Sequence, residues 1–174
     1  MTTRKTNKAG IDMLKKIEGC ELTAYPDPSS PLAKQCFQNK IRLVDYKKLP
    51  DWPKFSGAPW TIGYGNTGPD VRPGTIWTQE QADDKLKLRL TEFEGYVNSL
   101  VKIPITDNQF AALVSLCYNC GPGGLIKLIN GQPGPIQSIK WISDNIPEFR
   151  INKGTLSEQG LRNRRRAEQA LFNS

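Results

Sequence analysis

The sequence contains no histidine among its 174 residues. A chain without histidine cannot form a Ser-His-Asp or Cys-His nucleophile site, nor a zinc site with a histidine ligand. It also has no run of apolar residues that we judge long enough to span a bilayer. The basic start, MTTRKTNKAG, has no apolar stretch behind it. We therefore expect no secretory signal and synthesis in a cytoplasm.

Cysteine is scarce, with four residues in the chain: Cys20, Cys36, Cys117 and Cys120. The CYNC pair has the spacing of a redox or zinc motif, but it follows an apolar helical pattern and no strand and turn. The other two cysteines are not paired at zinc-knuckle spacing. We therefore expect buried thiols and neither a metal nor a cofactor, while a contact between Cys20 and Cys36 stays open.

Positive charge is in excess, with a formal net charge of +7. This favours a polyanionic partner, which could be nucleic acid, an anionic membrane face or an anionic wall polymer. The excess is concentrated in residues 28–58 and 162–166, although a solvated basic face would give the same pattern. No helix-turn-helix, RNA-binding aromatic pair or zinc spacing is found that could read bases. We therefore expect no nucleic-acid partner.

The pattern of apolar residues predicts a mainly helical α+β protein. A short first helix is expected over about residues 7–17, with Gly19 as its stop. A proline-rich segment follows, and PWTIGYGNTG is typical of a short strand that runs into glycine turns. These features predict a small β-containing lobe over about residues 19–75.

The rest of the chain, over about residues 76–174, is predicted to form a larger helical lobe. TQEQ (78–81) and TDNQ (106–109) have the form of capping boxes. The first precedes a long amphipathic pattern, and the second precedes FAALVSLCY, which is apolar almost all round and must lie in the core. The glycine-rich segment from Gly121 is expected to end that helix. Two further helices are expected, at about 135–145 and 157–172. We predict one domain over residues 1–174, with an active-site cleft between its lobes.

Two acids stand at the end of the first helix and in the turn that follows, Glu18 and Asp27. Glu18 lies at the foot of an apolar helix face, where burial would favour its protonated form. Asp27 lies between two prolines, in a turn where it could stay ionised. Most such pairs are solvated surface. An acid and a base in unlike surroundings are nevertheless what cleavage of a glycosidic bond requires, so the pair indicates a glycoside hydrolase.

The segment EGCELTAYPD, followed by WTIGYGNTG, resembles the signature of the phage-type lysozymes, the endolysins of tailed phages. The resemblance continues through DNQFAALVSLCYNCGPGGL, similar to the family's central buried helix, and LRNRRRAEQALF, similar to its terminal arginine-rich helix. It covers nearly the whole chain apart from the stretch after Asp27. It implies a lysozyme-like fold and a muramidase that hydrolyses the β-1,4 bond between N-acetylmuramic acid and N-acetylglucosamine in peptidoglycan.

The resemblance also implies roles for individual residues. Glu18 matches the general acid that protonates the leaving oxygen, and Asp27 with the hydroxyl of Thr61 matches the pair that holds the attacking water. An inverting reaction of this kind would place the two carboxyls roughly 6.5–9.5 Å apart. Three further positions match residues that contact the sugar, with a structural role left open for each: Thr67, Tyr118 and Asn119. The reaction needs no cofactor or metal.

Two features depart from the family pattern. Family members often have a histidine after Gly-Tyr-Gly, where this chain has Asn66, although no catalytic role is assigned to that histidine. Many members have only a few residues between Asp27 and Thr61, whereas this chain has an insertion over residues 28–58 that is rich in bases and aromatics. The insertion could be a lid, a patch that binds the anionic wall polymer, or a packed excursion.

The resemblance further implies lysis of a host cell, with peptidoglycan glycan strands as the partner. The protein would reach the periplasm or cell wall from the host cytoplasm through a pore made by a holin, and would act as a monomer. The basic C-terminal helix (Arg162, Arg164, Arg165 and Arg166) could contact an anionic outer membrane or dock onto the core. The alternative function is a non-catalytic cationic protein that binds wall or membrane, which would not need Glu18, Asp27 and Thr61 together.

Overall fold

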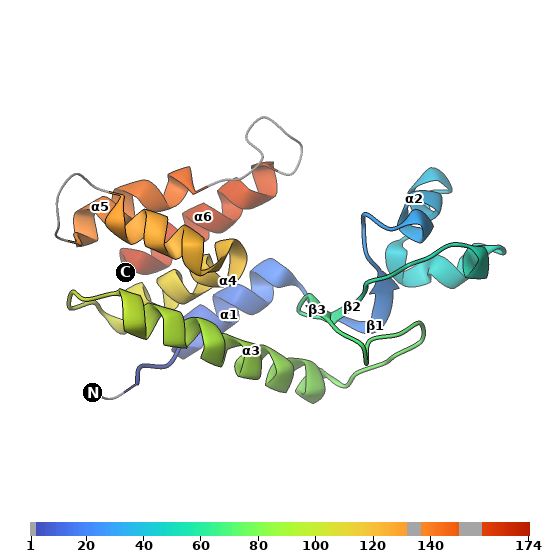
Figure 1. Ribbon diagram of the computed structural model, residues 1–174, viewed down its shortest axis with the longest axis horizontal. Coiled ribbons are helices and arrows are strands. Elements are labelled where there is room, and N and C mark those ends of the chain that lie inside the picture. The colour runs from blue at the N-terminus through green and yellow to red at the C-terminus, as the bar shows by residue number, and fades with distance from the viewer. Residues whose placement is uncertain (1–2, 132–136, 150–157) are drawn as a thin grey trace. The chain divides into compact units, whose positions relative to one another are not determined.

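The computed structural model of the protein describes residues 3–131, 137–149 and 158–174, and has the predicted α+β class (Figure 1). Its main elements follow the chain in this order: α1 (Lys8–Glu18), β1 (Glu21–Pro26), α2 (Pro31–Gln38), β2 (Trp60–Gly63), β3 (Asn66–Thr67), α3 (Gln79–Leu100), α4 (Asp107–Asn130), α5 (Ile139–Asn145) and α6 (Glu158–Phe172). The chain divides into two compact units. We call Glu18–Lys87 the sheet unit, and Met1–Ile17 with Leu88–Ser174 the helical unit.

The sheet unit contains an antiparallel sheet of three strands in the order β1-β2-β3. Tyr25 pairs with Thr61 between β1 and β2, and Thr61 pairs with Thr67 between β2 and β3. Residues directly opposite each other on antiparallel strands point to the same face. The side chains of these three residues therefore share one face of the sheet.

The predicted insertion forms much of the sheet unit's core. It folds into α2 and two 3-10 helices, η1 (Leu43–Lys48) and η2 (Trp52–Lys54). Its buried side chains share one cluster with those of the strands: Ala24, Leu32, Cys36, Tyr46, Leu49, Trp60, Ile62 and Val71. Trp52 and Phe55 pack against this cluster, whereas Phe37 is 56% exposed. The structure therefore shows that the insertion packs into the core, and a patch on it that binds the wall polymer stays a prediction.

The helical unit is built on α1, α4, α5, α6 and the later part of α3, with α6 packed against α4. Both predicted capping boxes are present. Thr78 and Gln81 exchange backbone-to-side-chain hydrogen bonds of 2.8 and 3.1 Å before α3, and Thr106 and Gln109 exchange bonds of 2.9 and 3.1 Å before α4. Each box satisfies two backbone donors that a helix start would otherwise leave without a partner.

Helix α4 differs from the prediction at its C-terminal end. Gly121 adopts a positive φ of 71°, which breaks the helical geometry, but the chain resumes a helix through Pro122 and runs to Asn130. The helix that begins at Asp107 therefore ends at Gly121, as predicted, and a further helix that was not predicted follows it directly. Because the two parts form one long apolar element, α4 also has the length and composition of a membrane-spanning helix, which we had not expected. Half of its most apolar window is buried inside the protein, as in a core helix.

The C-terminal helix α6 docks onto the core, one of the two outcomes that the sequence left open. Arg164 is 6% exposed and Arg165 is fully buried, and both form ion pairs with the buried Glu168, at 3.1 and 2.7 Å. Ser115 of α4 donates a hydrogen bond of 2.7 Å to the same carboxylate. Burial raises the pKa of Glu168, while the charges of Arg165 and Arg164 oppose that shift. Two of the four arginines thus hold α6 to α4.

Candidate active site

Glu18 is the last residue of α1, and the helix ends there because Gly19 takes a positive φ of 67°. Such a conformation costs glycine little and other residues more, which makes Gly19 a suitable stop. Glu18 itself is only partly buried. The full burial expected of this residue is therefore not found.

Asp27 follows directly after β1, and hydrogen bonds fix both its backbone and its side chain. Its backbone N–H donates to the carbonyls of Gly57 and Pro59, at 3.0 and 3.1 Å. Its carboxylate accepts hydrogen bonds from the backbone N–H of Ser29, at 2.8 Å, and from the Ser29 hydroxyl. These bonds form a turn in which an aspartate side chain binds the backbone two residues ahead. The carboxylate is therefore held in one orientation at the end of the strand.

Thr61 occupies the central strand of the sheet and is 7% exposed. Its partners across the strands are Tyr25 on one side and Thr67 on the other. Thr67, by contrast, is exposed at the sheet edge. The register thus joins the two threonines and the tyrosine in one row across the sheet.

The acids of this region converge on Tyr25. Burial raises the pKa of the Tyr25 phenol, and the negative charges of Glu21, Asp27 and Glu18 raise it further, in that order. Glu21 belongs to the same strand as Tyr25, and Asp27 directly follows that strand. Tyr25 belongs to the AYPD segment of the sequence, but the sequence alone suggested no role for it. Its position opposite Thr61 is what singles it out.

The turn after β2 is held by a second tyrosine. Tyr64 donates a hydrogen bond of 2.8 Å to Asp83 and accepts one of 3.0 Å from Gln79, at the start of α3. Burial, with the hydrogen bond to Asp83 as the next cause, raises the pKa of Tyr64 to about 12. Asn66, in the next strand β3, keeps its Oδ1 atom buried without a hydrogen-bond partner among the described residues.

The remaining two predicted site residues lie in the helical unit. The Tyr118 ring packs against Phe93, with centroids 5.2 Å apart, and the Arg89 guanidinium lies 4.7 Å from its centroid. Asn119 is exposed, and its side-chain oxygen accepts a hydrogen bond from the buried Arg165. Both side chains thus have internal partners, and Asn119 also presents an exposed surface.

The four cysteines are free thiols, so Cys20 and Cys36 form no disulfide. Burial raises the pKa of Cys117 to about 12 and that of Cys120 to about 11. Thiols with such values are rarely ionised at neutral pH and react poorly as nucleophiles. Within residues 3–131, 137–149 and 158–174, no three side chains of the metal-binding types gather into a group that could hold a metal ion.

Comparisons with known proteins show the family to which the chain is similar. Residues 41–168 match the family described as Phage lysozyme. An endolysin of Bacillus phage PZA is 34% identical over 173 residues, which is 97% of this chain and 55% of that protein. An endolysin of Lactococcus phage c2 is 35% identical over 170 residues, which is 97% of this chain and 60% of that protein. The chain thus spans a little over half the length of these two curated relatives.

Among solved structures, an endolysin from Escherichia coli O157:H7 phage FAHEc1 has a similar fold. The TM-score is 0.68 at 27% sequence identity, and the likeness covers 98% of this chain and 94% of that one. The likeness therefore extends over the strands and the helices of both proteins.

Proposed function

The chain belongs to the phage lysozyme family, and we propose that it hydrolyses the β-1,4 bond between N-acetylmuramic acid and N-acetylglucosamine in bacterial peptidoglycan. The whole of residues 1–174 would act as one catalytic domain. The fold is the lysozyme-like α+β fold that the sequence predicts, as the likeness to the phage FAHEc1 endolysin confirms. The roles below are our assignment of the family's chemistry to residues of this chain.

Glu18 acts as the general acid in this proposal. Its carboxyl gives a proton to the glycosidic oxygen, the bond from that oxygen to the anomeric carbon breaks, and positive charge develops on the sugar. Asp27 and Thr61 hold a water on the opposite face of the ring. The water oxygen bonds to the anomeric carbon while its proton passes to Asp27. The product would be a reducing end with inverted configuration.

The observation that carries the proposal is the convergence of acids on Tyr25. Glu18 and Asp27 act on the charge of the same phenol, although nine residues separate them in the sequence. Tyr25 is also the cross-strand partner of Thr61. Strand pairing with Thr61 and electrostatic influence from both acids thus come together at this one side chain. This gathering is what an acid, a base and a water-binding hydroxyl need if they are to act on one bond.

The surroundings of the two acids suit unlike roles. Asp27 accepts two hydrogen bonds from Ser29, which fix the direction of its carboxylate, as a group that holds a water requires. Glu18 is partly exposed at a helix end, where its carboxyl could reach a sugar oxygen. Thr61 is almost fully buried, so few rotamers are open to its hydroxyl. A fixed hydroxyl can orient a water without adding charge.

We assign contacts with the sugars to Thr67, Tyr118 and Asn119. Thr67 is exposed in the same row as Thr61, and Asn119 is exposed at the break of α4. The bond from Arg165 occupies the Asn119 oxygen and leaves its amide N–H groups to donate to a sugar hydroxyl. Tyr118 would offer the edge of a ring that Phe93 and Arg89 hold in place.

We also propose that the protein acts on the host wall as a monomer, after passage from the host cytoplasm through a holin pore. An inducible host that makes this chain with and without a holin tests the route. We expect lysis only when both are present. Lysis by the chain alone would show that another route exists.

The test of the activity is mass spectrometry of the fragments that wild type and Glu18→Gln release from purified peptidoglycan. We expect fragments that end in reducing N-acetylmuramic acid from wild type and none from the variant. Anhydro-muramic ends would mean a transglycosylase, and Asp27 and Thr61 would lose their water-binding role. If neither protein released fragments, the enzyme proposal would fail and a cationic wall- or membrane-binding function would take its place. Burial of Arg164 and Arg165 leaves that alternative with only Arg162 and Arg166 of the four arginines at the surface.

A further inference from the structure

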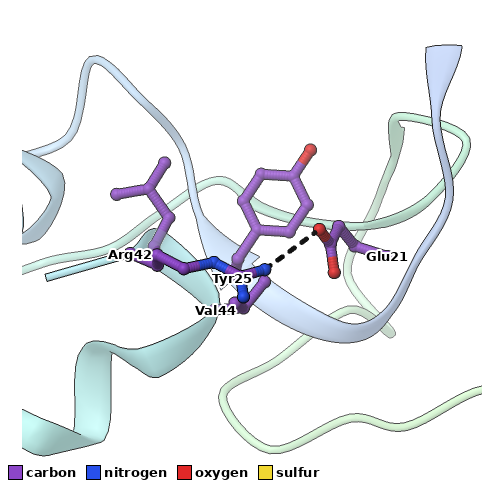
Figure 2. Close-up of a pocket in the computed structure, with 5 residues that line it drawn as sticks. Glu21, Tyr25, Arg42 and Val44 are labelled. Atoms are coloured by element: carbon purple, nitrogen blue, oxygen red, sulfur yellow. Dashed lines mark ion pairs between the residues drawn. The ribbon is translucent and has the colours of Figure 1, made fainter.

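A pocket of ≈ 240 Å³ opens in the sheet unit where η1 packs against β1. Glu21 and Tyr25 line it from β1, and Arg42, Leu43 and Val44 line it from the insertion. Figure 2 shows the Arg42 guanidinium and the Glu21 carboxylate turned toward one another beside the Tyr25 ring. None of the site residues predicted from the sequence lies in this pocket. It therefore offers a binding surface that the proposed reaction has not used.

The charged pair in the pocket is loose. Arg42 Nη2 and Glu21 Oε1 are 3.9 Å apart, and the two side chains are 73% and 47% exposed. Pairs of this length and exposure contribute little to stability, because water screens both charges. The guanidinium can therefore exchange Glu21 for another carboxylate at small cost. A planar guanidinium binds a carboxylate through two parallel hydrogen bonds, which makes Arg42 suited to that partner.

The pocket is joined to the proposed catalytic residues through Tyr25. This side chain forms part of the pocket wall and is also the cross-strand partner of Thr61. Its phenol is under the influence of Glu21 in the pocket and of Asp27 and Glu18 outside it. A ligand group bound next to Arg42 would therefore lie in a pocket whose wall includes the cross-strand partner of Thr61.

The segment that carries Arg42 is held firmly. Arg42 directly precedes η1, and Tyr46 of that 3-10 helix is 1% exposed, with its ring packed edge-on against Trp60 of β2 at a centroid distance of 4.9 Å. Leu49 follows it into the same core. The backbone at Arg42 is thus anchored against the sheet, which lowers the entropy lost when a ligand is bound.

We propose that this pocket binds a carboxylate of the peptide that branches from N-acetylmuramic acid, with Arg42 as its ligand, and that the insertion so selects glycan that still carries its stem peptides. Leu43 and Val44 supply the apolar wall for the small side chains of that peptide. Glu21 competes with the bound carboxylate for Arg42. The inference rests on the proposed muramidase activity and assigns it a substrate preference.

The test compares two substrates: soluble glycan strands with intact stem peptides, and the same strands after an amidase has removed them. For each protein we would measure kcat/KM on both and take the ratio of intact to stripped. We expect Arg42→Gln to lower this ratio about fivefold, since a charge-assisted hydrogen bond at an exposed site is lost. We expect Glu21→Gln to raise it about twofold, because the competitor for Arg42 is removed. The two variants thus shift one quantity in opposite directions.

The matched control is Lys54→Gln. Lys54 belongs to the same insertion, is 72% exposed and pairs with Asp51 at 2.8 Å, but it does not line the pocket. Its ratio should equal that of wild type. Equal ratios for Arg42→Gln and wild type would overturn the inference while leaving the muramidase intact. A loss confined to stripped strands would also overturn it, because the carboxylate would then be the lactyl group of the bare sugar. Failure of wild type on both substrates would count against the muramidase itself.

Discussion

The two units of this protein treat their charged residues in opposite ways. The helical unit buries Arg165 and Glu168 completely and joins them to Arg164 and Ser115. The sheet unit leaves the acids of its proposed site partly exposed and fixes them through the backbone of a helix end and a turn. The acid of the helical unit therefore has a structural role, whereas we propose a catalytic role for the acids of the sheet unit.

This difference between the units shows that a cluster of charged residues can have a structural role or a catalytic one. Buried ionisable groups with strongly shifted pKa values are often taken as candidates for catalysis. Here the most deeply buried acid of the described residues, Glu168, pairs with two arginines of its own helix α6 and accepts a hydrogen bond from Ser115 of α4, which explains it as a structural group. The proposed chemistry lies with acids that a substrate can reach. Variants that affect activity alone should therefore fall in the sheet unit, and variants that affect stability alone should fall at the buried pair.

The largest effect is expected for Glu18→Gln. Loss of a general acid lowers kcat by about 10³-fold, while the free energy of unfolding should change by less than about 0.5 kcal/mol. Turnover of labelled peptidoglycan and urea denaturation would measure the two quantities. The control is Glu80→Gln, an exposed acid of the same unit in the first turn of α3, which should leave both unchanged. A large loss of stability in Glu18→Gln would remove the contrast between the units.

The reverse pattern is expected for Glu168→Gln. The substitution leaves Arg164 and Arg165 buried without their negative partner, which should cost about 3 kcal/mol of unfolding free energy. Activity per folded molecule should stay within about twofold of wild type. Asp144→Asn serves as the control, since that acid pairs with Lys140 at 2.6 Å but is 55% exposed. Its cost should stay below about 0.5 kcal/mol. Equal losses of unfolding free energy in the two variants would show that the cost does not depend on burial of the charge.

A third variant, Leu32→Ala, tests whether the insertion is part of the sheet unit's core. Leu32 is fully buried in α2, and its truncation should cost about 2–3 kcal/mol. Phe37 of the same helix is 56% exposed, so Phe37→Ala should cost less than about 0.5 kcal/mol. Denaturant midpoints would measure both. An insertion that moved as a lid would show little cost for either.

The smallest effect is expected within α4, from a pair of glycines. Gly121 has a positive φ of 71° and open space around it, so Gly121→Ala should cost about 1 kcal/mol through backbone strain alone. Gly123 has equally open space but helical geometry, so Gly123→Ala should stabilise by up to about 1 kcal/mol. Thermal melts of the two proteins should therefore shift in opposite directions. A shift of the same sign in both would mean that the break at Gly121 is not intrinsic to its backbone.

Much of the local structure could be predicted from the sequence. The capping boxes at Thr78 and Thr106 and the stop at Gly19 each depend on residues within a few positions of one another. The amphipathic pattern of α3 likewise predicted buried residues such as Leu86 and Leu90. The helix that resumes at Pro122 was not predicted, because a glycine-rich segment is as typical of a loop as of a short break between two helices.

The proposed site was predictable only in part. Glu18, Asp27 and Thr61 follow from motifs, but their distances and the substrate contacts of Thr67, Tyr118 and Asn119 remain predictions. Tyr25 was not found, because its importance comes from strand register and not from its neighbours in the chain. Arg42 was counted only as one base among several, since nothing in the sequence shows that it lies beside Glu21.

The sequence by itself determined where the helices start, which face of α3 is apolar, and the family to which the chain belongs. Tertiary structure alone decided which charges are buried. A run of basic residues has the same composition on a solvated face and in a core, and the difference lies in partners that arrive from distant segments, as Ser115 does for Glu168. Tertiary structure also decided that the insertion packs against the strands of the sheet unit. Burial of an apolar side chain depends on the apolar surface that another segment brings against it. Local hydrogen bonds such as those of the capping boxes form between residues a few positions apart, so the sequence predicts them. Burial depends on contacts with segments from the whole chain.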